Sequence, residues 1–312
     1  MTTQTTMAKE EFAEAVKGKV MEMLGPDVEI TISEMRKNNQ VSYPCMTIRH
    51  PERRLAPNVK INDMYALYNN GHMDIEEIAE KIVAAYEGTE CDTSDLEYLQ
   101  TDPKKLYDKI IFRLVNYDRN KEMLNRCPHI RILDLAVIFC LTISLPNNES
   151  GDVKIDDRIA SMLELNAKEL MSYALQNTPK LCEAECRGIN SVISEILAKN
   201  AIPASIFPTF SEEMCERIPL KVLTNTFARN GAATILYPGV LERIREQLGQ
   251  DFYILPSSVH EVLITPCEDI GAEFFIDMVK EVNQTTVPPE EILSDNVYCY
   301  PRDFKELESL LA

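Results

Sequence analysis

The stretch Asp251-Phe-Tyr-Ile-Leu-Pro-Ser-Ser-Val-His-Glu-Val-Leu-Ile-Thr265 decides the fold of the C-terminal part of the chain. It consists of two apolar runs, residues 251–255 and 259–265, separated by Pro-Ser-Ser. Runs of this length that are rich in β-branched and aromatic residues are typical of strands, and proline and serine favour turns. The stretch therefore predicts a β-hairpin.

A second hairpin is predicted upstream of the first, with strands at residues 221–227 and 232–236. Arg229-Asn-Gly231 stands between them, and an Asn-Gly pair tolerates the positive φ angles of a tight turn. Helices are expected at 238–248 and 271–282, and a last strand at 296–300. The predicted order is ββα-ββα-β, which implies an α+β fold with an antiparallel or mixed sheet and its helices on one face.

The N-terminal part also mixes helices and strands. Phe12, Val16 and Val20 recur at helical spacing, which predicts a helix over 9–24, and Asp74 is expected to cap a helix over 74–86. Further elements are expected as follows: a helix at 62–70, three helices within 156–199, and strands at 28–35, 41–49, 109–117, 131–144 and 153–155.

The length of 312 residues favours two domains. We expect an N-terminal α+β domain over 1–126 and a C-terminal α+β domain over 127–312, with a helical insert at about 156–200. Residues 201–219 contain three prolines, and we expect a linker or a lid there.

The charge is strongly acidic, because 50 Asp and Glu residues face 32 Lys and Arg residues and give a net charge of −18. Such a charge repels phosphate backbones and attracts basic partners. It serves solubility alone, or it provides an acidic face that mimics nucleic acid or docks a basic protein. Direct nucleic-acid binding is not expected, since the chain has no Trp and no basic aromatic platform.

We expect a cytoplasmic protein that makes no membrane contact. Residues 1–14 show no apolar run after a basic start, so no secretory signal is predicted. The longest apolar stretch, 132–145, contains Asp134 and is too short to span a bilayer. The nine cysteines are an odd number, which is typical of reduced thiols.

Ser258, His260 and Glu261 are the catalytic candidates, because serine, histidine and an acid so close together suggest a hydrolase. Strand geometry argues against it. Neighbouring side chains point to opposite faces, so Ser258 and His260 share a face while Glu261 points away. No G-x-S-x-G motif is present. The alternative is a hairpin turn whose serines bind backbone groups.

Arg49-His-Pro-Glu-Arg-Arg54 is the one basic cluster in the sequence. We expect it in a loop after a strand, where binding residues are common. Arg49, Arg53 and Arg54 are therefore candidates for binding an anion such as phosphate. The alternative is a solvated loop whose arginines pair with neighbouring acids.

No metal site and no cofactor are predicted. The four histidines are far apart in sequence, Cys182-x-x-x-Cys186 has no second thiol pair, and Cys127-Pro-His129 is a poor chelate. The sequence contains neither GxGxxG nor GxxxxGK[ST], so a nucleotide cofactor of those classes is not expected.

Three C-terminal strings resemble a known family: Asn230-Gly-Ala-Ala-Thr-Ile-Leu-Tyr-Pro-Gly-Val-Leu241, residues 251–262, and Val287-Pro-Pro-Glu-Glu-Ile-Leu-Ser-Asp295. The resemblance extends to Ala56-Pro-Asn-Val59. The family is the clostridial domain of unknown function 5688. The resemblance implies a gut-bacterial cytoplasmic protein, often encoded in variable genome regions, and it supplies no catalytic residues.

Two functional hypotheses follow. The first is a non-enzymatic cytoplasmic interaction protein with an acidic surface and a basic protein partner; its link to mobile elements or host defence rests on the resemblance alone. The second is an enzyme of an unfamiliar class, with a cleft between the N-terminal domain and the C-terminal sheet near Asn230, Ser258 and His260.

Overall fold

The computed structural model describes residues 7–53, 56–88, 94–144, 150–199, 219–256, 258–267 and 271–304. The chain divides into two compact units. Unit 1 comprises Met1–Glu97 and Ile143–Gly151, and unit 2 comprises Tyr98–Thr142 and Asp152–Ala312. The boundary predicted at 126/127 lies within unit 2. In the described residues no helix has the length and apolar character needed to cross a membrane.

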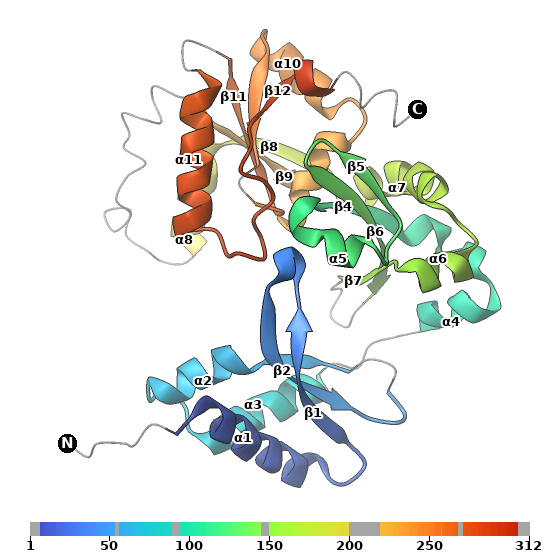
Figure 1. Ribbon diagram of the computed structural model, residues 1–312, viewed down its shortest axis with the longest axis vertical. Coiled ribbons are helices and arrows are strands. Elements are labelled where there is room, and N and C mark those ends of the chain that lie inside the picture. Colours follow the sequence, from blue (N-terminus) through green and yellow to red (C-terminus); the bar gives the residue numbers. More distant parts are fainter. Residues whose placement is uncertain are drawn as a thin grey trace. The chain divides into compact units, whose positions relative to one another are not determined.

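Unit 1 packs helices against a three-stranded antiparallel sheet of order β1-β2-β3 (Figure 1). Ile30 lies opposite Ile48 in the β1–β2 register, and both are buried in one core with Phe12 and Ile78 from the helices. The opposite face carries the pairs Glu29–Arg49 and Thr31–Thr47, and also the buried Cys45. The elements are α1 (Lys9–Leu24), β1 (Glu29–Arg36), β2 (Ser42–Arg49), β3 (Asn58–Lys60), α2 (Ile61–Asn69) and α3 (Ile75–Glu87).

The predicted helices and hairpin of this unit are confirmed. α1 has the predicted bounds, because Phe12, Val16 and Val20 form its buried stripe. Asp74 caps α3 as expected: its side chain accepts a hydrogen bond from the Glu77 N–H, and the Glu77 carboxylate accepts one from the Asp74 N–H. This reciprocal capping box satisfies two backbone donors at the start of the helix.

The first sheet of unit 2 has the order β4-β6-β5, and β7 pairs with β6. The single strand predicted over 131–144 is wrong, since the chain folds back between β5 and β6. Leu133 takes a φ of 55° at this turn, which its apolar character gave no reason to expect. The strands are β4 (Ile110–Asn116), β5 (His129–Ile132), β6 (Leu135–Ser144) and β7 (Ser150–Lys154); α4 (Ser94–Thr101) and α5 (Lys121–Leu124) are short helices nearby in sequence.

The second sheet is antiparallel, with the order β12-β10-β11-β9-β8. It contains the predicted hairpin, in which Phe252 lies opposite Pro266. The two sheets share one core with α6, α7 and α10. The strands are β8 (Ala184–Gly188), β9 (Lys221–Asn225), β10 (Phe252–Leu255), β11 (Val262–Pro266) and β12 (Tyr298–Tyr300), and the helices are α6 (Asp157–Leu163), α7 (Ala167–Leu181), α8 (Ile189–Lys199), α10 (Val240–Leu248) and α11 (Ala272–Thr285).

The fold class is α+β, and both faces of the second sheet are covered (Figure 1). Side chains alternate along β10: Phe252 and Ile254 enter the shared core, whereas Leu255 packs against Phe275 of α11. Ile244 of α10 belongs to the shared core. The expectation that all helices lie on one face is therefore corrected, because α10 and α11 lie on opposite faces.

Two further predicted elements are wrong. Residues 232–236 are not a strand but belong to the 3₁₀ helix Gly231–Leu236, all of which is buried. A short run without alternating burial does not distinguish strand from helix. Ala184–Gly188, which lies within the stretch expected to form three helices, is the edge strand β8. Its residues are mostly half-buried and lack an apolar alternation. The linker or lid expected at 201–219 falls almost entirely outside the described residues.

Gly231 is required for a close approach of three segments. Positive φ angles were predicted for both residues of the Asn-Gly pair. Asn230 has a φ of 55°, whereas Gly231 is not in the positive-φ region. A Cβ on Gly231 would lie 2.5 Å from the His260 carbonyl oxygen and 2.7 Å from the Asn225 nitrogen. Both neighbours are backbone atoms, which have little freedom to move away.

We expect Gly231→Ala to lower the free energy of unfolding by about 1–3 kcal/mol, because the added methyl group overpacks the core. Urea unfolding measures this. Gly18→Ala is the control, since a Cβ on Gly18 in α1 meets nothing within 4 Å. Alanine should stabilise that helix by about 0.5–1 kcal/mol. A Gly231→Ala protein with the wild-type midpoint would contradict the close packing.

Candidate functional site

The three catalytic candidates lie in the loop that precedes β11. That strand begins at Val262, so Ser258, His260 and Glu261 do not follow the strand geometry assumed for them. The Ser258 hydroxyl donates to Glu261 Oε1 at 2.8 Å and accepts from the His260 N–H at 2.9 Å. Ser258 is only 5% exposed. Its hydroxyl is thus engaged within the loop and does not contact the His260 ring.

His260 is oriented by two other segments. Its Nδ1 accepts a hydrogen bond from the Asn230 N–H at 3.2 Å, which places the proton of the neutral ring on Nε2. That Nε2 lies 3.5 Å from Glu291 Oε1. A histidine beside a carboxylate can accept a proton, but among the described residues no serine hydroxyl is hydrogen-bonded to this ring. The arrangement gives two separate pairs, Ser258–Glu261 and His260–Glu291, and no triad.

Glu291 was missed because the acid was sought next to His260 in sequence. The only available signal was its place in the string 287–295. Backbone contacts fix it in the loop: the Val259 N–H donates to the Glu291 carbonyl at 2.8 Å, and the Ala232 N–H donates to the Val259 carbonyl at 3.2 Å.

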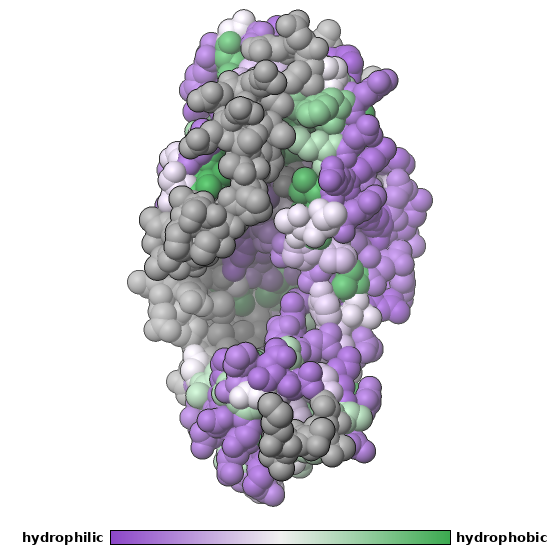
Figure 2. Space-filling view, turned by 90° about the vertical axis from the view of Figure 1, so that its left-hand side faces the viewer, coloured by the Kyte–Doolittle hydropathy of each residue, from purple (hydrophilic) through white to green (hydrophobic). Residues whose placement is uncertain are grey.

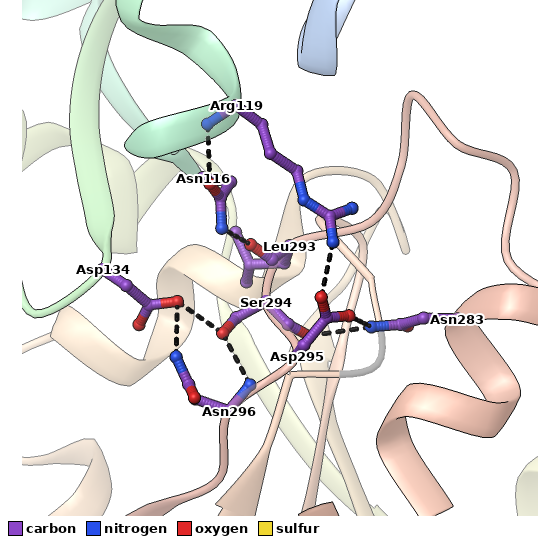
Figure 3. A network of polar contacts seen from close by, with 8 residues as sticks. All are labelled: Asn116, Arg119, Asp134, Asn283, Leu293, Ser294, Asp295 and Asn296. Carbon is purple, nitrogen blue, oxygen red and sulfur yellow. Dashed lines mark hydrogen bonds and ion pairs between the residues drawn. The ribbon is translucent and has the colours of Figure 1, made fainter. Parts of the chain in front are cut away.

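A partly buried polar network anchors the segment that follows Glu291 (Figure 3). Asp134, in the turn between β5 and β6, accepts hydrogen bonds from Ser294 Oγ at 2.6 Å and from Asn296 Nδ2 at 3.0 Å. The Tyr298 hydroxyl donates to its other oxygen at 2.7 Å. Burial raises the pKa of Tyr298 well above its ordinary value, and the Asp134 carboxylate raises it further. Tyr298 therefore stays protonated and remains a donor.

Residues 293–295 of the same segment form further polar contacts with three other parts of unit 2 (Figure 3). Asn116 donates to the Leu293 carbonyl at 2.9 Å, and Arg119 pairs with Asp295 at 2.6 Å. Asn283 of α11 donates to the Ser294 carbonyl at 2.8 Å. Ser294 is fully buried and Asn283 is 4% exposed. These contacts hold the segment in place, so we interpret the network as a scaffold, although Asn283 Oδ1 is buried and has no hydrogen-bond partner among the described residues.

The basic cluster of the sequence lines a pocket in unit 1. Arg49 and Arg53, two of the three anion-binding candidates, border it together with His50, and its volume is about 440 Å³. Arg54 lies outside the described residues. The structure thus brings two of the predicted residues to one cavity.

A second pocket, in unit 2, was not predicted. It has a volume of about 480 Å³ and lies where α6 ends and α7 begins, with Asp157, Glu164 and Glu169 on its walls. Glu164 takes a φ of 57° at the C-terminal end of α6, and Asn166 caps α7. The pocket could have been predicted from Asn166. A capping residue marks the start of a helix, and a tight turn between two helices brings the acids on both sides of it together.

The cysteines of the described part of the chain are free thiols. Burial raises the pKa of Cys127, Cys140, Cys182 and Cys186, which lowers their reactivity. Cys186 lies in β8 and not in the helical setting expected for it. His129 Nδ1 contacts the Cys127 carbonyl and not its thiol. Within the described residues, no three His, Cys, Asp or Glu side chains are placed to hold a metal ion.

A family model described as a family of unknown function, DUF5688, matches residues 9–302. The chain belongs to this family. The match spans both units and includes the strings at 230–241, 251–262 and 287–295. No curated protein and no solved structure matches the chain. Residue roles in this member of DUF5688 therefore rest on its own geometry.

We expect Ser258→Ala to lower the free energy of unfolding by about 1–3 kcal/mol, because it leaves the Glu261 carboxylate and the His260 N–H without a partner. His260→Ala should cost about 1 kcal/mol or less, since it removes one hydrogen bond from a half-buried ring. Urea unfolding of both variants checks the order. A Ser258→Ala protein as stable as the wild type would instead favour a serine kept for chemistry.

Proposed function

We propose that this protein is a non-enzymatic cytoplasmic interaction protein that binds a basic protein partner. The pocket between α6 and α7, here called the acidic pocket, would receive a cationic side chain of that partner. One observation carries the proposal: Asp157, Glu164 and Glu169 all line the pocket, and no Lys, Arg or His stands among its described lining residues.

The carboxylates of the acidic pocket differ in how far they are already occupied. Glu169 Oε2 accepts the Asn166 N–H at 2.8 Å, as part of the cap of α7. Asp157 and Glu164 are exposed and form no side-chain ion pair with another described residue. These two side chains are therefore the ones that a lysine or arginine of a partner would contact.

The net charge of −18 supports the same partner class at longer range. It accelerates encounter with a basic protein and weakens as salt increases. Figure 2 shows a largely hydrophilic surface on the face drawn, with hydrophobic side chains scattered among the hydrophilic ones. Scattered apolar residues are ordinary for a protein surface. The net charge is the feature on which we base the choice of partner class.

The alternative is an enzyme of an unfamiliar class that uses the Ser258 and His260 region. One observation favours it, the 3.5 Å approach of Glu291 to the His260 ring. The burial of Ser258 weighs against it, because a nucleophile must reach its substrate.

The test measures binding of a fluorescent octalysine peptide by anisotropy, at low and at physiological ionic strength. We expect the paired substitution Asp157→Asn with Glu164→Gln to weaken binding roughly threefold or more, since it removes two exposed ion pairs. Glu169 is left unchanged because it caps α7.

The control pair is Glu246→Gln with Asp277→Asn, two exposed acids on α10 and α11. It changes the net charge by the same amount and should affect binding less. Equal weakening by both pairs would show that the attraction is diffuse and that the acidic pocket is not the docking site. Binding that does not depend on salt would contradict the proposal as a whole.

A further inference from the structure

A pocket in unit 1 carries side chains of both charges. Asp27, Glu29, Arg49, His50, Pro51, Arg53 and Ala56 line it, and we call it the mixed-charge pocket. Pockets that bind apolar ligands are lined mainly by apolar and aromatic groups. Here only Pro51 and Ala56 are apolar, so the fitting ligand is small and charged.

Arg53 is fixed in advance of any ligand. Its guanidinium lies 4.2 Å from the centroid of the Tyr86 ring, and its Nη1 donates to the Tyr86 carbonyl at 2.8 Å. Tyr86 is 4% exposed and lies in the last turn of α3, so this support is rigid. A guanidinium has five N–H donors, and this contact uses one of them. A planar, preoriented guanidinium suits a carboxylate, which accepts two parallel hydrogen bonds.

Glu29 and Arg49 balance each other. They lie directly opposite in the β1–β2 register, where side chains of opposite charge attract. Asp27 precedes β1 and has no such cross-strand partner. Its exposed carboxylate is the remaining negative group on the wall that also holds Arg53.

His50 contributes a donor and no fixed charge. Its Nδ1 accepts the Glu52 N–H at 3.1 Å, and the Arg53 N–H closes the same turn by donating to the His50 carbonyl at 3.1 Å. This contact at Nδ1 leaves Nε2 of the ring available to a ligand. Among the described residues that line the mixed-charge pocket, the formal charges of two arginines and two carboxylates cancel, which suits a ligand that is itself neutral overall.

We propose that the mixed-charge pocket binds a small zwitterion of the amino-acid class, whose carboxylate pairs with Arg53 and whose ammonium group pairs with Asp27. This site is separate from the acidic pocket and does not depend on it. Each end of the ligand meets the opposite charge, whereas a phosphate would meet Asp27 and Glu29 as repelling neighbours.

The experiment titrates the full chain, by isothermal calorimetry, with amino acids of increasing length: glycine, β-alanine, γ-aminobutyrate and ε-aminocaproate. Acetate, methylammonium and inorganic phosphate are the comparison probes. We expect at least one amino acid to bind saturably and about tenfold more tightly than acetate or methylammonium, since it gains a second charge-assisted contact.

Arg53→Gln and Asp27→Asn should each weaken that binding about tenfold. The matched controls are Lys81→Gln and Asp63→Asn, exposed residues of unit 1 outside the pocket, which should leave it unchanged. Asp27 is exposed, so its variant should fold even if loss of the Tyr86 contact destabilises Arg53→Gln.

Failure of every amino acid to bind would overturn the proposal. So would phosphate binding that is tighter than amino-acid binding and strengthened by Asp27→Asn, which would show a simple anion site.

Discussion

The hydrogen bonds that the Asp134 carboxylate accepts connect the first sheet of unit 2 to the segment before β12. Asp134 lies in the turn of the β5–β6 hairpin and accepts hydrogen bonds from Ser294, Asn296 and Tyr298, some 160 residues later in the chain. A buried polar group is costly unless it is hydrogen-bonded, and hydrogen bonds to a charged acceptor are stronger than neutral ones. The three donors and the carboxylate therefore satisfy one another only when the first sheet stands next to the segment that leads into β12. This requirement fixes how the two sheets enclose their shared core.

The geometry of the His260–Glu291 pair and of the two pockets depends on supporting contacts of this kind more than on any single sequence motif. The segment anchored by Asp134 places Glu291 beside His260, and the close packing at Gly231 fixes the His260 backbone. The cap of α7 shapes the acidic pocket by holding Glu169 at its own helix end. In unit 1, the last turn of α3 supports Arg53 at the mixed-charge pocket.

Local signals in the sequence were sufficient for α1, for the cap at Asp74 and for the β10–β11 hairpin, because periodicity, capping and turn residues act over a few positions. They failed where distant contacts decide. The apolar run 131–144 conceals the turn at Leu133, and residues 231–236 are buried on all sides, so their spacing indicates neither strand nor helix. The same limit applies to the sites. Arg49 and Arg53 are close in sequence and share a pocket, whereas the partner of His260 is Glu291, which no local spacing could identify.

A double-mutant cycle between Asp134→Asn and Tyr298→Phe tests whether the Asp134 carboxylate joins the first sheet to β12. The free energy of unfolding is measured in urea for the wild type, both single variants and the double variant. If the Asp134 carboxylate joins the two sheets through these donors, the costs are not additive, and the coupling energy is at least about 1 kcal/mol, within the range seen for residues of one hydrogen-bond network. Additive costs, or an Asp134→Asn protein that unfolds at the wild-type midpoint, would contradict this role of the Asp134 carboxylate.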